Sequence, residues 1–141
     1  MTVRPATSGD APRLVALFEQ LGYPSTAEAI AARLERNTAP GYRAWVFDAG
    51  DGSGPAGFAG GHVLLPWEHD DPAAQLMILV VDERRRGRGV GKALVAVFEE
   101  WARDQGAVRL LVGSGTAREK THRFYLNRGF EQTGLRFAKR L

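Results

Sequence analysis

An arginine- and glycine-rich segment, residues 86–92, combines side chains and spacing suited to binding an anion. It reads Arg-Gly-Arg-Gly-Val-Gly-Lys and lies between an apolar run, Leu76–Val81, and an amphipathic run, Val90–Trp101. These runs predict a strand followed by a helix, so the glycines fall at a helix N-terminus. Backbone N–H groups there have no partner within the helix, and glycine lets an anion approach closely. We therefore predict that this segment binds phosphate.

The spacing excludes two common phosphate-binding motifs. A Walker loop needs Gly-x-x-x-x-Gly-Lys followed by Ser or Thr, but Arg86 stands five positions before Gly91. Ala93, which has no hydroxyl to bind magnesium, follows the lysine. A dinucleotide fingerprint needs Gly-x-Gly-x-x-Gly, whereas these glycines are spaced two and two. What remains is Arg-x-x-Gly-x-Gly at a junction of strand and helix.

This pattern resembles the pyrophosphate-binding segment of the GNAT family of N-acetyltransferases. The resemblance implies that acetyl-CoA is the cosubstrate and that main-chain amides hold its diphosphate. The alternative is a glycine-rich turn beside a solvated or nucleic-acid-binding arginine run. Three alternating glycines argue against it, because each weakens a helix start by about 1 kcal/mol relative to alanine. The residues that match the family's CoA-binding segment are Leu79, Val80, Val81, Arg86, Gly87, Arg88, Gly89, Val90, Gly91 and Lys92.

A second motif follows at residues 118–130, which predict a short helix closed by Gly129 at its C′ position. Its Phe-Tyr-x-x-x-Gly-Phe pattern is similar to the last helix of the GNAT family, whose tyrosine lies beside the CoA sulfur. The resemblance implies that Phe124 contacts CoA and that Tyr125 is catalytic, as a donor to the leaving thiolate. On pattern alone, both rings fit ordinary core packing equally well. Arg118 replaces an asparagine common in the family, and either binds phosphate or forms an ion pair.

The general base is not marked by either motif. Many family members carry a glutamate in the strand before the CoA segment, where this chain has Met77 and Ile78. An alkylamine with a pKa near 10.4 costs about 4.6 kcal/mol to keep neutral at pH 7, so a base matters. We expect Glu68, in the loop before that strand, to be the base, although a solvated loop is the plain interpretation of this segment. The alternatives left open are His62, His69, Asp70, Asp71 and a water chain.

The whole chain has the length and composition of one domain, 1–141, with 44% apolar and 25% charged residues and a net charge of +3. The absence of cysteine excludes disulfides, thiolate metal sites and a cysteine acyl-enzyme. We expect no metal site in the protein. Whether a divalent ion assists binding of the acceptor stays open. The chain shows no leader and no long apolar stretch, which predicts a cytoplasmic protein without a membrane partner.

The pattern of apolar residues predicts an α/β (α+β) protein in the order β-α-α-β-β-β-α-β-α-β. This order is similar to the GNAT fold, with a mixed central sheet. The predicted strands are Thr2–Pro5, Tyr42–Asp48, Gly57–Leu65, Gln75–Val81, Arg109–Val112 and 135–141. The predicted helices are Ala11–Leu21, one opened by a capping box at Ser25–Glu28, Val90–Trp101 and 118–129.

The resemblance implies acetyl transfer from acetyl-CoA to a primary amine of a small polar or anionic metabolite, by direct attack and without a covalent intermediate. Acetylation of peptide or protein N-termini or lysines, and a CoA-binding sensor without catalysis, stay open. The tail is also similar to the aminoalkylphosphonate N-acetyltransferase branch. We expect no nucleic-acid partner, because the arginine run lacks interleaved aromatics. A homodimer stays open.

Overall fold

The computed structural model describes residues 2–113, 119–134 and 137–141. The chain divides into two compact units, Met1–Leu111 and Val112–Leu141. The first unit holds nearly all of the sheet and three helices, and the second holds the last helix. The prediction of a single domain over 1–141 stays a prediction.

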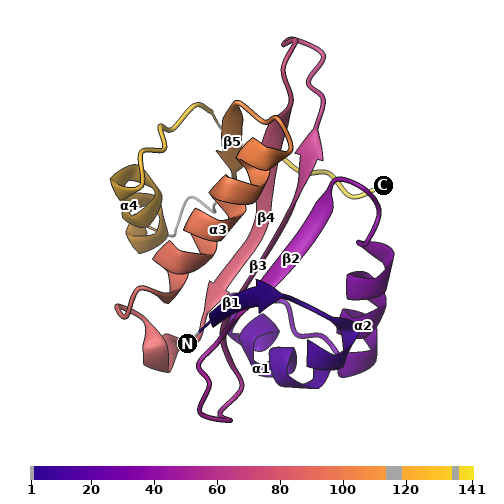
Figure 1. Ribbon diagram of the computed structural model, residues 1–141, viewed down its shortest axis with the longest axis vertical. Helices are drawn as coiled ribbons and strands as arrows, with labels where there is room; N and C mark the ends of the chain where they lie inside the picture. The colour runs from indigo at the N-terminus through magenta and orange to yellow at the C-terminus, as the bar shows by residue number, and fades with distance from the viewer. Residues whose placement is uncertain (1, 114–118, 135–136) are drawn as a thin grey trace. The chain divides into compact units, whose positions relative to one another are not determined.

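Five strands form one sheet in the spatial order β1-β2-β3-β4-β5, and the first four pair antiparallel (Figure 1). The Val108 N–H donates to the Pro72 carbonyl at 3.0 Å. Because these residues directly precede β5 and β4, the two strands begin at the same end and run parallel, as in the predicted mixed sheet. The strands are β1 Thr2–Pro5, β2 Tyr42–Asp48, β3 Pro55–Leu64, β4 Ala73–Val81 and β5 Arg109–Val112.

The helices begin and end close to their predicted positions. They are α1 Ala11–Leu21, α2 Ala27–Arg36, α3 Val90–Asp104 and α4 Glu119–Asn127, with 3₁₀ turns η1 Ser8–Asp10 and η2 Glu83–Arg85. Gly22 ends α1 at a φ of 98°, which favours glycine. The predicted capping box is wrong by one residue. The Thr26 hydroxyl, and not that of Ser25, caps α2 by accepting from the Ala29 N–H at 3.1 Å.

Helices α1 and α2 cover one face of the sheet and α3 crosses the other (Figure 1). On the first face the Phe18 and Phe58 rings pack with centroids 5.6 Å apart. Burial of such side chains supplies the main stabilising free energy of this layer. The members of this core larger than alanine are Leu14, Leu17, Phe18, Ile30, Val46, Phe58 and Val80.

Two glycines of β3 let α3 lie unusually close to the other face. A Cβ on Gly57 would lie 2.8 Å from the Val90 side chain. One on Gly61 would lie 2.7 Å from the Phe98 ring and 2.2 Å from the Gln75 carbonyl oxygen. Real Cβ atoms do not approach this closely, so the position of α3 depends on both glycines.

The last predicted strand is not formed by residues 137–141, and residues 135–136 lie outside the described part of the chain. Phe137 and Leu141 are exposed. Alternation of apolar residues marks a strand only where an edge is available to pair with it, and the sequence cannot show that edge. Within the described residues, no helix is long and apolar enough to cross a membrane.

Candidate active site

The predicted phosphate-binding segment leads from β4 through η2 into α3. Gly87 and Gly89 have φ values of 78° and 81°, a left-handed conformation that favours glycine. Gly89 is the N-cap of α3 and has no side chain to satisfy the first amides of the helix. The first turn closes with the Ala93 N–H donating to the Gly89 carbonyl at 3.0 Å. The amides before Ala93 in α3 therefore have no acceptor within the helix.

The space above this segment is open. A Cβ built on Gly87 or Gly89 would meet no atom within 4 Å in the described structure. Arg88 and Lys92 are exposed, Gly91 is half-buried, and Val90 is buried under the helix. This arrangement presents partial positive charge and unhindered amides to solvent, which suits a diphosphate.

The arginine run divides into two pairs with different surroundings. Arg84 and Arg85 both form ion pairs with Asp82, at 3.3 and 3.9 Å. Arg86 and Arg88 are exposed, and no interaction of either side chain is recorded with the described residues. The second pair is therefore the one available to an anionic ligand.

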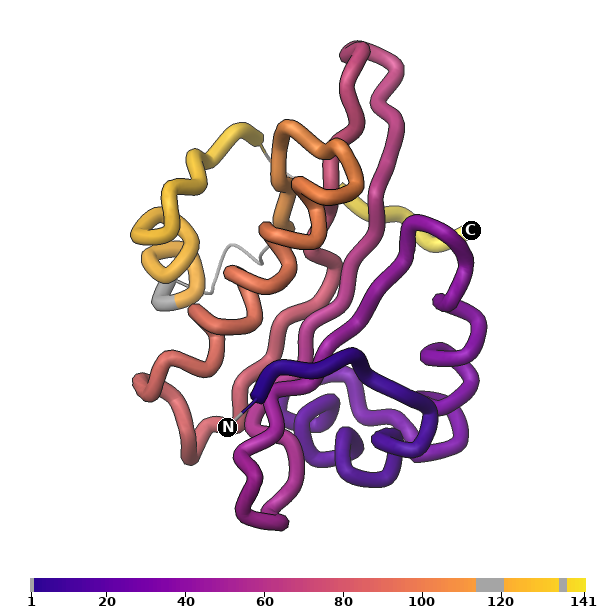
Figure 2. The backbone as a smooth tube through the Cα atoms, in the orientation of Figure 1, coloured from indigo at the N-terminus to yellow at the C-terminus, as the bar shows by residue number. Residues whose placement is uncertain are grey.

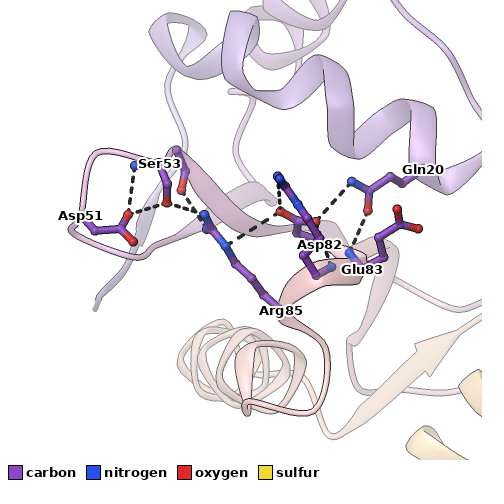
Figure 3. Close-up of polar contacts among 8 residues, drawn as sticks. Gln20, Asp51, Ser53, Asp82, Glu83 and Arg85 are labelled. Atoms are coloured by element: carbon purple, nitrogen blue, oxygen red, sulfur yellow. Dashed lines mark hydrogen bonds and ion pairs between the residues drawn. The ribbon is translucent and has the colours of Figure 1, made fainter.

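Asp82 anchors the start of the segment (Figure 3). Its carboxylate accepts from the Arg84 N–H at 3.2 Å and from the Gln20 amide of α1 at 3.4 Å. The Gln20 Oε1 in turn accepts from the Glu83 N–H at 2.9 Å. Burial alone would raise the pKa of Asp82, but the hydrogen bonds from Arg84 and Gln20 outweigh it and lower that pKa.

Arg85 connects the same point to the turn between β2 and β3. Its guanidinium donates to the Gly54 carbonyl at 3.3 Å and to the Ser53 hydroxyl. The Ser53 N–H donates to the Asp51 carboxylate at 2.9 Å. Figure 2 shows this turn and the start of the 82–89 segment at the same end of the sheet. The phosphate-binding segment is thus held to two elements distant in sequence.

The predicted CoA residues Leu79, Val80 and Val81 form the last part of β4. Val80 is buried against the α1 side, while the other two are half-buried. β5 has four residues and β4 has nine, and the two begin level with each other. The end of β4 therefore extends past β5, leaving an edge without a strand partner among the described residues. Such an edge offers N–H and C=O groups to an extended, amide-bearing ligand.

A pocket of about 560 Å³ lies beside the middle of the sheet, between α2 and the strands. Its floor includes Ala44, Gly60 and Ile78, and its other lining residues include the loop 37–41 and Trp101 and Gln105 of α3. Its charged lining residues are Arg33, Arg36 and Arg43, and no aspartate or glutamate lines it. The pocket thus combines an apolar floor with arginines from α2 and β2.

A β-bulge opens into this pocket. The pairing of β3 with β4 shifts so that Gly60 faces Ile78 and Gly61 faces Leu76, which leaves Met77 without a partner on β3. Met77 also lines the pocket. Bulges interrupt strand pairing and are frequent next to active sites. The sequence gives no signal for this bulge, because it depends on the register between two strands.

The predicted base, Glu68, lies at the exposed tip of the β3–β4 hairpin, which projects from the sheet (Figure 1). His69, Asp70 and Asp71 are exposed in the same turn, and none of the four lines the pocket. His62 lies on β3, nearer the bulge. The role of Glu68 stays a prediction.

In the second unit, Phe124 and Tyr125 lie on α4, and Gly129 ends this helix as predicted. The Gly129 N–H donates to the Leu126 carbonyl and the Phe130 N–H to the Tyr125 carbonyl, each at 3.2 Å. This pair of hydrogen bonds is a Schellman motif. The Tyr125 ring is buried, and its centroid lies 5.3 Å from that of Phe124 and 5.4 Å from that of Phe130. The Arg118 prediction lies outside the described residues.

Sequence reasoning missed the supporting residues Gln20 and Asp82 and the pocket beside α2. An aspartate at the end of an apolar strand and directly before a short turn, here Glu83–Arg85, is an N-cap signal, so Asp82 could have been found. Gln20 and the pocket residues come together only in the folded chain.

Comparison with known proteins gives a consistent result. Residues 11–130 match the model of the Acetyltransferase (GNAT) family. N-acetyltransferase 8F1 of Rattus norvegicus is 40% identical over 63 residues, which are 45% of this chain and 28% of that protein. Aminoalkylphosphonate N-acetyltransferase of Salmonella typhimurium is 35% identical over 80 residues, 57% of this chain and 52% of that protein. The matches thus span about half or less of these relatives.

Two solved structures have a similar fold. One, from Agrobacterium tumefaciens, is 27% identical with a TM-score of 0.85 and covers 100% of both chains. The other is an aminoglycoside N-acetyltransferase in complex with CoA, 20% identical with a TM-score of 0.83, covering 99% of this chain and 93% of that one.

Proposed function

The chain belongs to the GNAT family of acetyltransferases, and we propose that it transfers the acetyl group of acetyl-CoA to the primary amine of a small anionic metabolite. The family assignment supplies the reaction class, an acetyl-CoA-dependent acyl transfer. The acceptor and the roles of individual residues are part of the proposal. So are a cytoplasmic location and the absence of membrane and nucleic-acid partners, while a homodimer stays open.

The described residues fit acetyl-CoA. The open amides at the start of α3 and the exposed Arg86 and Arg88 suit the diphosphate. The unpaired edge at Leu79–Val81 suits the amide groups of the pantetheine arm. Bound acetyl-CoA supplies the activated thioester, and these residues hold and orient it.

The proposed reaction is direct attack. The amine nitrogen forms a bond to the carbonyl carbon, and the tetrahedral intermediate then breaks its C–S bond. The Tyr125 hydroxyl donates to the departing sulfur as negative charge develops there. A donor that acts mainly on the developing charge raises kcat more than it tightens substrate binding.

The arginines that line the pocket select the acceptor in this proposal. Arg33, Arg36 and Arg43 line the pocket without any acidic residue, so an acceptor with a carboxylate or phosphonate gains charge-assisted hydrogen bonds there. A cationic acceptor, such as an aminoglycoside or a lysine-rich peptide, meets repulsion instead. The name of the Salmonella relative agrees with an acceptor that carries both an amine and a phosphonate.

A pair of acceptors tests the proposal. We expect 3-aminopropylphosphonate to be acetylated with a higher kcat/KM than n-propylamine, which has the same amine and chain but no anion. Arg36→Gln should lower kcat/KM for the phosphonate and leave that for propylamine nearly constant. Equal kcat/KM for both acceptors would contradict the anionic assignment. Binding of acetyl-CoA without acetylation of any amine, including peptides, would favour the sensor alternative.

A further inference from the structure

His62 lies at one end of the pocket face, held by contacts from two neighbouring strands. In the register of the sheet it faces Tyr42 of β2 and Gln75 of β4. Its ring stacks on the Tyr42 ring, with centroids 5.1 Å apart and planes 18° apart. Its Nε2 lies 3.1 Å from the Gln75 Oε1. The half-buried imidazole therefore has a fixed orientation.

The alternation of β3 places His62 on the same face as the pocket floor. Side chains two residues apart on a strand share a face, so His62 lies on the face of Gly60, which lines the pocket. Tyr42 also lines the pocket. The unpaired Met77 of the bulge is two residues from Gln75 along β4. His62 does not itself line the pocket, and its ring reaches the pocket's edge through Tyr42, on which it stacks.

The contact with Gln75 sets the tautomer of His62. An amide oxygen can only accept a hydrogen bond, so the Nε2 of His62 carries the hydrogen that is donated to it. In a neutral imidazole the other nitrogen, Nδ1, then has a lone pair. The groups in contact with the ring are Tyr42 from β2 and Gln75 from β4, and neither is a carboxylate or a basic side chain.

We propose that His62 is the general base, and that its Nδ1 takes the proton from the ammonium group of the acceptor. This inference rests on the proposed function. The neutral amine then forms the C–N bond with the thioester carbon. It loses a second proton during the transfer, and the departing thiolate gains one. The net proton passes from the His62 imidazolium to solvent.

The position of His62 distinguishes it from Glu68. Glu68 lies in the exposed turn beyond the end of β3, whereas His62 lies within the strand and stacks on Tyr42, which lines the pocket. A general base contributes about 10²- to 10⁴-fold to the rate. It matters most when the acceptor amine is protonated, because the base then supplies the reactive neutral form.

The test compares wild type, His62→Gln and Glu68→Gln with acetyl-CoA and 3-aminopropylphosphonate. The glutamine amide of His62→Gln can still donate to Gln75, which preserves the strand contact while removing the base. At about pH 7 we expect kcat to fall by about 10²- to 10⁴-fold, with KM for acetyl-CoA unchanged. Going from pH 7 to about pH 9.5 raises the neutral fraction of an alkylamine about 300-fold, so the defect should shrink over this range.

The outcomes distinguish a general base at His62 from a structural histidine. A defect that shrinks as the pH rises supports His62 as the base, while a defect of constant size would assign it a structural role and overturn the proposal. Wild-type activity of His62→Gln, or a defect in Glu68→Gln alone that is relieved at high pH, would also overturn it. If wild type acetylates no amine, the proposed function itself fails, and the assignment of His62 fails with it.

Discussion

Substitution of Asp82 by asparagine tests whether the contacts behind the phosphate-binding segment hold it in position. The carboxylate is buried, with 4% of the residue exposed. It accepts hydrogen bonds from the Arg84 N–H and the Gln20 amide, and both Arg84 and Arg85 form ion pairs with it. Asparagine keeps one acceptor oxygen but turns an NH₂ group toward the guanidinium groups.

The expected loss follows from these contacts. A hydrogen bond to a charged group contributes about 1.5–3 kcal/mol, and the Asp82 contacts at 3.3 and 3.9 Å are longer than ideal, so we expect a loss near the lower end, about 2 kcal/mol. For a chain of this size, such a loss lowers Tm by roughly 4–10 °C. The affinity for acetyl-CoA should also fall, because η2 orients the amides that follow it.

Thermal unfolding and calorimetric titration with acetyl-CoA measure the two effects. Glu83→Gln is the matched control, because it removes one negative charge at the residue that follows Asp82. The hydrogen bond that Glu83 forms to Gln20 uses only its backbone N–H and is kept. If Asp82→Asn melted and bound acetyl-CoA like Glu83→Gln, the reasoning about the Asp82 contacts would be refuted.

The contacts of Asp82 also predict how the unfolding free energy of the protein changes with pH. The pKa of Asp82 is lowered in the folded protein, because hydrogen bonds outweigh the effect of burial. A group of this kind stabilises above its unfolded pKa of about 3.9 and loses that contribution as the pH falls through its lower folded value. The difference in unfolding free energy between wild type and Asp82→Asn should be complete at neutral pH and shrink below about pH 4.

Four further substitutions test three separate parts of the account. Gly91→Asp and Gly89→Asp should abolish calorimetric binding of acetyl-CoA, because a carboxylate at the start of α3 repels the diphosphate; an unchanged Kd in either variant would contradict the assignment. Tyr125→Phe should lower kcat by about 10- to 1000-fold at constant KM for acetyl-CoA, and activity within about twofold of wild type would indicate a purely structural ring. Gly61→Ala should cost about 1–3 kcal/mol of stability, because its Cβ would lie 2.2 Å from a carbonyl oxygen; Gly60→Ala, with its nearest contact at 3.3 Å, is the comparison and should melt higher.

Local sequence signals predicted the elements that depend on neighbouring residues. The bounds of α1, the end of α4 at Gly129 and the glycines before α3 follow from caps and backbone freedom, which act within a few residues. The choice of Thr26 over Ser25 as N-cap was missed because adjacent hydroxyl residues give the same signal. The absence of a strand at residues 137–141 was missed because pairing depends on a partner edge.

The candidate site was predicted where it follows one segment and missed where it depends on tertiary contacts. Residues 86–92 are contiguous, so their conformation was accessible from the pattern. The bulge at Met77 depends on the register of two strands, and the setting of His62 depends on Tyr42 and Gln75 on either side. The expectation for Glu68 rested on loop position alone, which does not show whether a side chain reaches a pocket.

The most direct test of the central claim is the release of free CoA in the presence of an amine. The chain contains no cysteine, so a thiol reagent detects only the CoA product. With acetyl-CoA and 3-aminopropylphosphonate, we predict thiol release that requires the amine and is matched one to one by N-acetylated product in mass spectrometry. Thiol release of equal rate without the amine, or none in its presence, would contradict the account.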